Sequence, residues 1–585
     1  MQHQFLQNER KNIPDCALNK IPNYRSLSLT LVMLLSNAEL AIGQVIPPDP
    51  GKIGIPLPRL DTPMVQPPDI KKDKPVAVGQ RADTELKTSI KNIEIHSPIL
   101  QDNIAHDAGL AVFVGQNKVS GSEIDEAAAR IVAICRRQGQ MVRTQIDLHD
   151  DPAGSVLTAT VQLVRVRTVS VDSVGATPVA TNRLDTIKKV IEADVRGGGS
   201  LDLDRIDNLL MQQLFLGDVS VHVDLVPVDA GLVDLKIQVS QAFEKPLTFA
   251  VQYDDSGLRS YGPNRISAAL GVPGRMLDGD NLEVAAVTST GMHYGRLFYE
   301  VPVVFLGSRL QFWGSELRYN SAGTHGVARQ AGTALTKLLY ADSETNLTAG
   351  LEYSRRHQSD WLPGEIQSGD KILDSWRLGV TGSRTLPLGQ SFSGTAGVRT
   401  GHLDLSPLAA AQIQDAAGAR TEGRYKTADW GVNWSGPLTQ SVPLSFLVSA
   451  RGQFADKNVD STEKFILGGR DGVRAFNSIE GRGDSGQILS LETSYQAAPW
   501  LKGSVFYDVG WIQRNHTSWT ADAIPNNYSL KGWGAGLSVL ALGANTRLLW
   551  AHQVGSNPGL DALGRDADGQ KNSRYHLWLS VSWKR

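Results

Sequence analysis

The sequence predicts two small α+β modules followed by an all-β transmembrane barrel of about 16 antiparallel strands. Three observations support this fold class. Hydrophobic residues recur at helical spacing only before Gln241. After Gln241 the chain consists of runs of roughly ten residues in which apolar and polar side chains alternate, separated by clusters of Gly, Pro, Asn and Asp. Such runs continue to the last residues of the sequence.

The composition excludes several classes of function. The chain has 585 residues, a formal net charge of −2 and 20% charged residues, so no overall charge attracts nucleic acid. Its 12 histidines form neither an H-x-x-x-H nor an H-E-x-x-H pattern, and no nucleophile-elbow signature is present. We therefore expect no enzyme activity, no metal, no cofactor and no nucleic-acid partner.

The first 43 residues have the features of an export signal. Lys11, Lys20 and Arg25 precede the apolar run LSLTLVMLLSNAELAIGQ, which is too short for a stop-transfer helix and ends in small residues. We assign residues 1–43 to a signal peptide. The proline-rich residues 44–87 are expected to form an extended linker, in which no plug helix is evident.

Residues 88–167 and 168–242 are predicted to form the two α+β modules. The first contains the strand IKNIEIHS, a helix opened by Ser122 with Asp125 three residues later, and two further strands. Cys135 has helical spacing with Ile124 and Ile131, which predicts a buried small hydrophobic residue and not a nucleophile. The second contains one strand, the helices NRLDTIKKVIEADV and LDLDRIDNLLMQQLF, and two more strands.

Residues 243–585 are predicted to form the barrel. In the run LKGSVFYDVGW one face carries apolar residues such as Tyr507 and Trp511, and the other carries Lys502, Ser504 and Asp508. A soluble sandwich also alternates in this way. The aromatic ends of the apolar faces, the charges on the opposite faces and an even strand number favour a membrane barrel.

The stretch LGGRDGVRAF combines backbone freedom with charge. It lies between the eleventh and twelfth predicted strands, in a segment, 467–484, that we expect to fold into the barrel. Asp508 points into the lumen, where a partly hydrated carboxylate gains from a cationic partner. Arg474 can offer its planar fork to that carboxylate from a glycine-rich loop, so we predict that Arg474 and Asp508 form a latch. The alternative is a structural ion pair with no role in transport.

The whole pattern resembles the two-partner secretion transporters (TpsB family), which have two POTRA modules and a 16-stranded outer-membrane barrel. The resemblance runs from about Lys87 to Arg585 and rests on two motifs. The inward loop motif comprises Gly469, Arg470, Val473, Arg474 and Phe476, and the barrel-wall motif comprises Phe506, Asp508 and Gly510. Ala475 stands where the family usually has glycine, so the loop tip is expected to differ in shape.

The resemblance implies a function. A family member secretes one large unfolded exoprotein, of haemolysin, adhesin or toxin type, from the periplasm across the outer membrane of a Gram-negative bacterium. The POTRA modules would recognise the N-terminal secretion domain of that partner, the barrel would contact outer-membrane lipid as a monomer, and no nucleotide would be needed. The alternatives are a barrel-protein insertase of the same superfamily and a general solute porin.

One further motif has a simple explanation. Arg482, Gly483 and Asp484 spell an adhesion tripeptide, but a three-residue match in a loop is weak evidence for adhesion. Coincidence is the better interpretation of this match.

Overall fold

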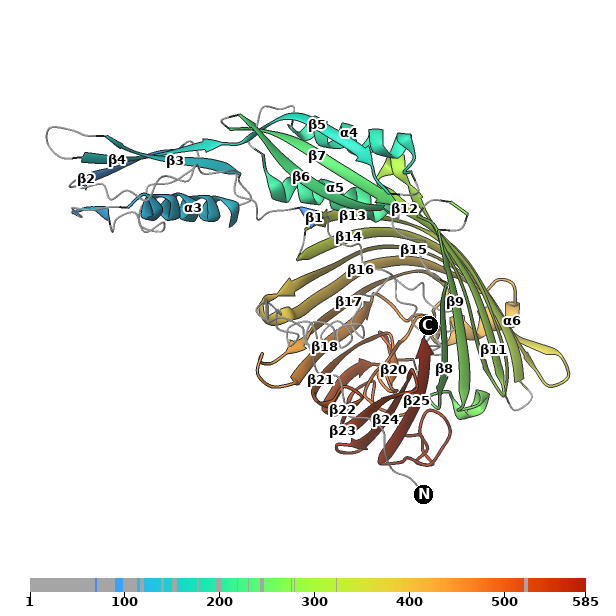
Figure 1. Ribbon diagram of the computed structural model, residues 1–585. Coiled ribbons are helices and arrows are strands. Elements are labelled where there is room, and N and C mark those ends of the chain that lie inside the picture. The colour runs from blue at the N-terminus through green and yellow to red at the C-terminus, as the bar shows by residue number, and fades with distance from the viewer. Residues whose placement is uncertain are drawn as a thin grey trace, which may run out of the picture. The chain divides into compact units, whose positions relative to one another are not determined.

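The computed structural model describes most of the chain after residue 89, together with a short segment before it (Figure 1). The described residues are 69–70, 90–97, 113–115, 120–137, 141–149, 155–175, 178–195, 201–217, 219–229, 231–241, 247–274, 276–277, 279–321, 324–342, 344–519 and 524–584. The predicted signal peptide lies outside these residues, and so does the predicted linker except for residues 69–70.

The first α/β unit is a three-stranded sheet with one helix. Its strands follow the order β2 (Ile90–His96), β4 (Ser155–Leu163) and β3 (Val142–His149), with β2 parallel and β3 antiparallel to β4. Helix α3 (Gly121–Arg137) contributes Ile124, Ile131 and Cys135 to a core in which each is at most 1% exposed. The prediction that Cys135 is a buried core residue is therefore confirmed.

The start of α3 differs from the prediction. Ser120 and Glu123 form the capping pair, and not Ser122 and Asp125 as predicted. The Glu123 N–H donates to Ser120 Oγ at 3.2 Å, and the Ser120 N–H donates to Glu123 Oε2 at 2.9 Å. A glutamate is long enough to reach back to the backbone of the capping residue, which is why it is preferred over aspartate at this position.

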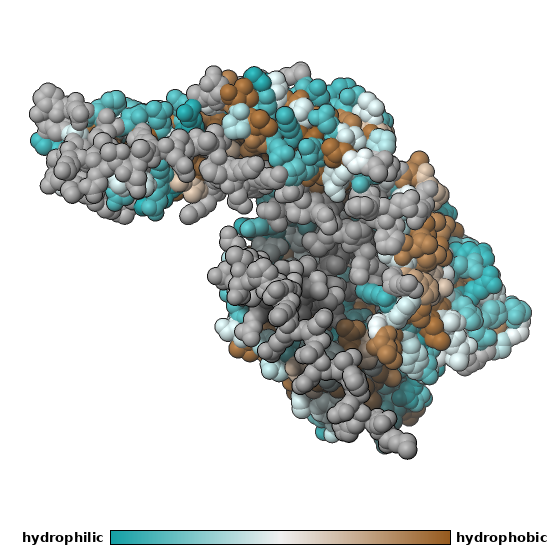
Figure 2. All heavy atoms as spheres, viewed as in Figure 1, coloured by the Kyte–Doolittle hydropathy of each residue, from teal (hydrophilic) through white to brown (hydrophobic). Residues whose placement is uncertain are grey.

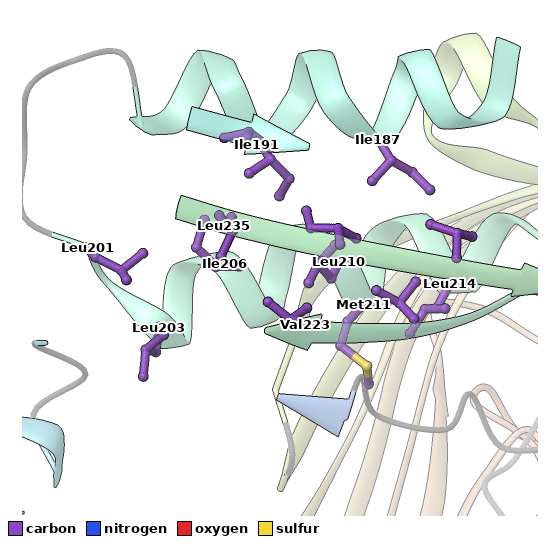
Figure 3. Close-up of a cluster of buried hydrophobic side chains, with 14 of the residues drawn as sticks. Ile187, Ile191, Leu201, Leu203, Ile206, Leu210, Met211, Leu214, Val223 and Leu235 are labelled. Atoms are coloured by element: carbon purple, nitrogen blue, oxygen red, sulfur yellow. The ribbon is translucent and has the colours of Figure 1, made fainter. Parts of the chain in front are cut away.

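The second α/β unit has a four-stranded sheet and two helices. Its strands lie in the order β1 (Asp69–Ile70), β6 (Val219–Asp229), β7 (Leu232–Gln241) and β5 (Arg165–Ser173). Helices α4 (Thr181–Val195) and α5 (Leu203–Leu216) supply the core in Figure 3, where Ile187 and Ile191 point toward the strand that carries Leu235. Asp202 caps α5 by accepting hydrogen bonds from the Asp204 and Arg205 N–H groups.

The remainder forms a closed barrel of 16 strands, all paired antiparallel, which confirms the predicted barrel and its strand number. The barrel strands in chain order are β8 (Thr248–Asp254), β9 (Arg265–Pro273), β10 (Asn281–Ser289), β11 (Met292–Val303), β12 (Ser308–Ser321), β13 (Thr324–Ala341), β14 (Thr345–Leu362), β15 (Ile366–Leu386), β16 (Gln390–Asp404), β17 (Gly423–Pro437), β18 (Leu444–Ala455), β21 (Ser485–Ala498), β22 (Leu501–Gln513), β23 (Asn527–Ala541), β24 (Ala544–Gln553) and β25 (Tyr575–Lys584). The barrel closes between β25 and β8, whose register runs from Ser580↔Asp254 to Lys584↔Ala250.

Short elements lie in the connections. One α-helix, α6 (Ala409–Ala417), follows β16, and the 3₁₀ turns are η3 (Arg259–Tyr261), η4 (Val304–Leu306) and η5 (Pro387–Gly389). Residues 456–484 connect β18 to β21 and contain the small hairpin of β19 (Phe465–Ile466) and β20 (Arg482–Gly483). We call residues 456–484 the inward loop; they include the segment 467–484 predicted to fold into the barrel.

The outer wall of the barrel is apolar. Val505, Tyr507 and Trp511 of β22 are 40–62% exposed, whereas Phe506 and Asp508 of the same strand are buried on the opposite face. Figure 2 shows hydrophobic residues gathered on the outer surface of the barrel strands. A soluble sandwich would bury this face in its core, so the structure excludes the sandwich alternative. No helix in the described part of the chain is long and apolar enough to cross a membrane.

Candidate functional site in the barrel lumen

The inward loop folds back through a tight turn. The chain makes a tight loop between Gly468 and Val473, which pair as an isolated parallel bridge, and within it the Gly472 N–H donates to the Gly469 carbonyl at 3.0 Å. Gly469 has φ +104°, a conformation that side chains other than glycine rarely adopt. A Cβ on Gly472 would lie 2.1 Å from the Leu467 carbonyl oxygen, so no larger residue fits there. These two glycines explain how the turn brings Arg474 against the barrel wall.

Arg474 contacts Asp508 of β22 through three hydrogen bonds. The guanidinium donates from Nε to Oδ2 at 2.9 Å and from Nη2 to Oδ1 at 2.8 Å, and the Arg474 backbone N–H donates to Oδ2 at 3.0 Å. Arg474 is 6% exposed and Asp508 is not exposed at all. The Arg474 guanidinium carbon also lies 3.5 Å from the centre of the Phe506 ring. The inward loop motif and the barrel-wall motif therefore meet at one buried contact.

A second carboxylate and a second arginine complete the charge cluster. Arg474 Nη1 donates to Glu492 of β21, and Arg547 Nη2 of β24 donates to Glu492 Oε1 at 3.1 Å. Two guanidinium groups thus face two carboxylates, and Lys502 also interacts electrostatically with Glu492. The contacts of Glu492 and Arg547 with this cluster were not predicted from the sequence. The alternation of apolar and polar residues along their strands indicates that both side chains face the lumen. The strand register that brings them next to Arg474 cannot be read from one sequence.

Apolar packing surrounds this charge cluster. The buried loop residues Phe465, Leu467, Val473, Ala475 and Phe476 pack with wall residues from β21 to β25. The wall makes room for them with glycines. A Cβ added to Gly532 would lie 2.4 Å from Ala475 Cβ, and one added to Gly510 would lie 2.8 Å from Leu467 Cδ2. On the closing strand β25, the Trp578 indole N–H donates to the Arg474 carbonyl at 2.7 Å.

The remaining motif residues have different surroundings. Ala475 is not among the non-glycine residues with positive φ, and its methyl group faces Gly532, so this position needs no glycine. Phe476 is 1% exposed within the apolar cluster. Arg470 does not join the charge cluster; it interacts electrostatically with Asp255, in the connection after β8.

The inward loop also reaches the opposite side of the lumen. Lys371 Nζ of β15 donates to both carboxylate oxygens of Asp460 at 2.9 Å. Glu463 is paired with Arg356 of β14 at 3.3 Å and with Arg399 of β16 at 3.9 Å. We call β14–β16 the far wall and β21–β25 the near wall. The loop therefore spans the lumen and contacts both walls.

The tripeptide Arg482 to Asp484 has a structural role. Asp484 has no exposed surface and accepts hydrogen bonds from Lys464 Nζ at 2.6 Å and from the His516 N–H at 2.7 Å. A buried carboxylate cannot serve as an adhesion determinant. Among the described residues, no group of three or more His, Cys, Asp or Glu side chains is placed to hold a metal ion.

Comparison with known proteins agrees with this architecture. Residues 233–539 match the family described as "Haemolysin secretion/activation protein ShlB/FhaC/HecB". The heme/hemopexin transporter protein HuxB of Haemophilus influenzae (strain 86-028NP) is 23% identical over 366 residues, which cover 60% of this chain and 62% of HuxB. The outer membrane transporter CdiB of Dickeya dadantii is 22% identical over 323 residues, covering 52% and 55%. The matches therefore span less than two thirds of these relatives.

Solved structures show the same fold. CdiB from Escherichia coli superposes with a TM-score of 0.59 at 16% identity, covering 97% of this chain and 100% of CdiB. CdiB from Acinetobacter baumannii gives a TM-score of 0.57 at 15% identity, covering 97% and 100%. More than half of the chain matches the family, and its fold is that of an outer-membrane barrel with an inward loop. The chain belongs to the haemolysin secretion/activation protein family ShlB/FhaC/HecB, the two-partner secretion transporters that its sequence resembles.

Proposed function

We propose that this protein is an outer-membrane translocase that secretes one large exoprotein from the periplasm to the cell exterior. The observation that carries the proposal is the inward loop, held across the lumen by the buried contact between Arg474 and Asp508, in a chain of this family. A channel for small solutes needs a constriction, but it does not need two α/β units ahead of the barrel. We assign those units to POTRA modules in the periplasm.

The two POTRA modules offer sheet edges to an unfolded partner. In the second module β6 has 11 residues, and within the part of the chain that the structure describes its outer edge pairs only at His222 and Val223, with β1. The rest of that edge presents backbone donors and acceptors that an extended segment can complete by adding a strand. Recognition of the partner's N-terminal secretion domain in this way gives affinity through the backbone and specificity through alternate side chains.

The topology gives the barrel a direction. The chain enters β8 at the barrel end where the strands are joined by short turns, such as η4 and η5. The inward loop and the long connection after β24 begin at the opposite end, which we place outside the cell. The partner crosses without nucleotide hydrolysis. Its folding outside makes return unfavourable, because the folded product no longer fits the lumen.

The test is secretion of a specific partner. The gene next to this one would be co-expressed with the wild-type chain or Asp508→Ala in a Gram-negative host, if it encodes a large exported protein. We expect release of the partner into the medium to depend on this chain and to fall with Asp508→Ala at equal barrel abundance. If the partner stays in the periplasm with the wild type, the secretion proposal for this pair fails. Assays of barrel insertion and solute flux then test the insertase and the porin.

A further inference from the structure

The inward loop holds its two walls by different means. Five buried apolar loop residues pack on the near wall, and Arg474 donates three hydrogen bonds to Asp508 there. Toward the far wall, the part of the loop that makes contact is residues 456–464, which we call the arm. Among the buried residues of the arm, Val459 is the one hydrophobic side chain, and it packs with Leu373, Leu403 and Tyr425.

Lys457 and Asn458 of the arm donate hydrogen bonds to backbone carbonyl groups in the connection between β16 and β17. The contacts of the arm with β14–β16 are otherwise ionic. They join Asp460 to Lys371, and Glu463 to Arg356 and Arg399. Lys371 and Asp460 are 17% and 12% exposed, so water already reaches part of that pair. Arg356 and Glu463 are 4% and 5% exposed and are as buried as Arg474 and Glu492 on the near wall. When charged groups separate into a hydrated lumen, water solvates them again. Release of the loop from the near wall would instead expose apolar side chains to water and separate the Arg474 guanidinium from its buried partners.

The lumen also has room beside the loop. A cavity of about 340 Å³ lies next to Phe465 and is lined by residues of β16, β17 and β18, among them Asp429 and Arg451. The hairpin of β19 and β20 packs closely against β21 and β22. A Cβ added to Gly486 of β21 would lie 2.7 Å from Phe465 of β19, and one added to Gly483 of β20 would lie 2.6 Å from Ile512 of β22. The arm can therefore move without displacing the segment that carries Arg474.

We infer that the lumen opens at the far wall: the arm releases Lys371, Arg356 and Arg399 while Arg474 stays bound to Asp508. The near wall is then the fixed side of the gate and the far wall is its releasing side. Release also leaves the three basic side chains of β14–β16 facing the passage, where they can contact carboxylates and carbonyl oxygens of a moving polypeptide. This inference rests on the proposed secretion function, but it concerns a channel property that can be measured without a partner.

The first experiment measures single-channel currents of the purified full chain in planar lipid bilayers. Glu463→Gln and Asp460→Asn each remove one of the two arm carboxylates that pair with the far wall, with little change in shape, and each is expected to raise the fraction of open time about fivefold or more. The matched control is Glu316→Gln, since Glu316 pairs with Arg318 and Arg329 on an exposed part of β12 and β13. Heat-modifiable migration on gels confirms that each barrel is folded.

The second experiment tethers the loop to one wall at a time. A short bis-maleimide joins cysteines at Glu463 and Arg356 for the far wall. The second pair of cysteines replaces Ser478 and Ser256, whose side chain and carbonyl are 2.8 Å apart; Ser256 follows β8, the strand that pairs with β25 of the near wall. Both pairs are introduced into a Cys135→Ser background. We expect the channel with the far-wall cysteine pair to open more often than the wild type before cross-linking and to stay closed after it. The pair at Ser478 and Ser256 should open normally in both states.

Two outcomes would overturn the inference. One is an unchanged open fraction in both Glu463→Gln and Asp460→Asn. The other is a closed channel when the loop is tethered at Ser478 and Ser256, because opening would then require movement on the side we regard as fixed. Neither outcome bears on whether the chain secretes a partner, since no partner is present. A failed secretion assay, in turn, leaves the channel measurements valid.

Discussion

Two arginine–aspartate contacts in this protein have nearly the same geometry and very different surroundings. Arg167 donates to Asp234 from Nε at 3.0 Å and from Nη2 at 2.6 Å, and Arg474 donates to Asp508 from the same two atoms. In the second α/β unit the two side chains are 50% and 16% exposed, whereas in the lumen they are 8% and 0% exposed. Geometry alone therefore does not say what a pair contributes. Exposure decides whether water can replace the lost partner.

The largest effect is expected from Asp508→Asn. This substitution keeps the shape of the side chain but removes the negative charge that balances the buried guanidinium of Arg474. The unfolding free energy should fall by about 3–5 kcal/mol. Urea unfolding of the barrel in lipid vesicles measures the change. Exchanging the two charges, with Asp at position 474 and Arg at 508, should recover part of the loss. A charge-exchanged protein no more stable than Asp508→Asn would show that the pair does not act as an ion pair.

A smaller effect is expected where the wall meets the loop. Gly532→Ala would place a methyl carbon 2.4 Å from Ala475 Cβ, so the loop or the strand must shift, at about 1–3 kcal/mol. Gly503→Ala is the matched control, because nothing lies within 4 Å of a Cβ added there. Limited proteolysis of the loop in the folded barrel is the measurement. Equal cleavage rates in Gly532→Ala and Gly503→Ala would mean that this contact does not hold the loop.

Breaking the exposed contact between Arg167 and Asp234 should lower stability only slightly, and the size of this effect should depend on pH. The Arg167 and Thr168 side chains donate to Asp234 and lower the pKa of its carboxyl to about 2. The pKa of an aspartate in the unfolded chain is about 3.9, so the stabilisation is complete above that pH and is lost as pH falls toward 2. We expect Asp234→Asn to lower the melting temperature of the second α/β unit slightly at pH 6. The difference from the wild type should shrink at pH 3, and a difference that grows on acidification would contradict the assignment.

The smallest effect is expected at Cys135. Burial raises the pKa of its thiol and removes it from solvent, so both factors slow reaction with a maleimide. Mass spectrometry should find this cysteine unlabelled in the folded chain and labelled after denaturation. Rapid labelling of the native protein would show that the first α/β unit opens often.

The sequence was sufficient for the parts of the fold that depend on local pattern. Alternation over each strand identified the barrel, and the separation of Phe506, Asp508 and Gly510 by two residues placed all three on one face of β22. The inward loop could be located because glycine and charge occur together in a position between two strands.

The contacts that depend on register could not be predicted. Glu492 meets Arg474 because β21 and β22 pair with Glu492 opposite Phe506, and Arg547 joins them from two strands away. The far-wall contacts link residues 64 to 107 positions apart, from Arg399 with Glu463 to Arg356 with Glu463. At the start of α3, Ser120 and Ser122 are each followed three residues later by an acidic residue. Glu123 is long enough to reach back to the Ser120 N–H, and this distinguishes the two serines.

The seam between β25 and β8 has a consequence for how the protein assembles. Its five residue pairs join positions more than 300 residues apart, so the seam carries a larger loop-closure entropy than any neighbouring strand pair and is expected to form late in folding. Trp578 lies on β25 and donates to the Arg474 carbonyl, so the inward loop completes its contacts only when that strand is in place. The position of the loop thus reports that the barrel has closed, and a barrel with an open seam lacks one of the contacts that keep its lumen shut.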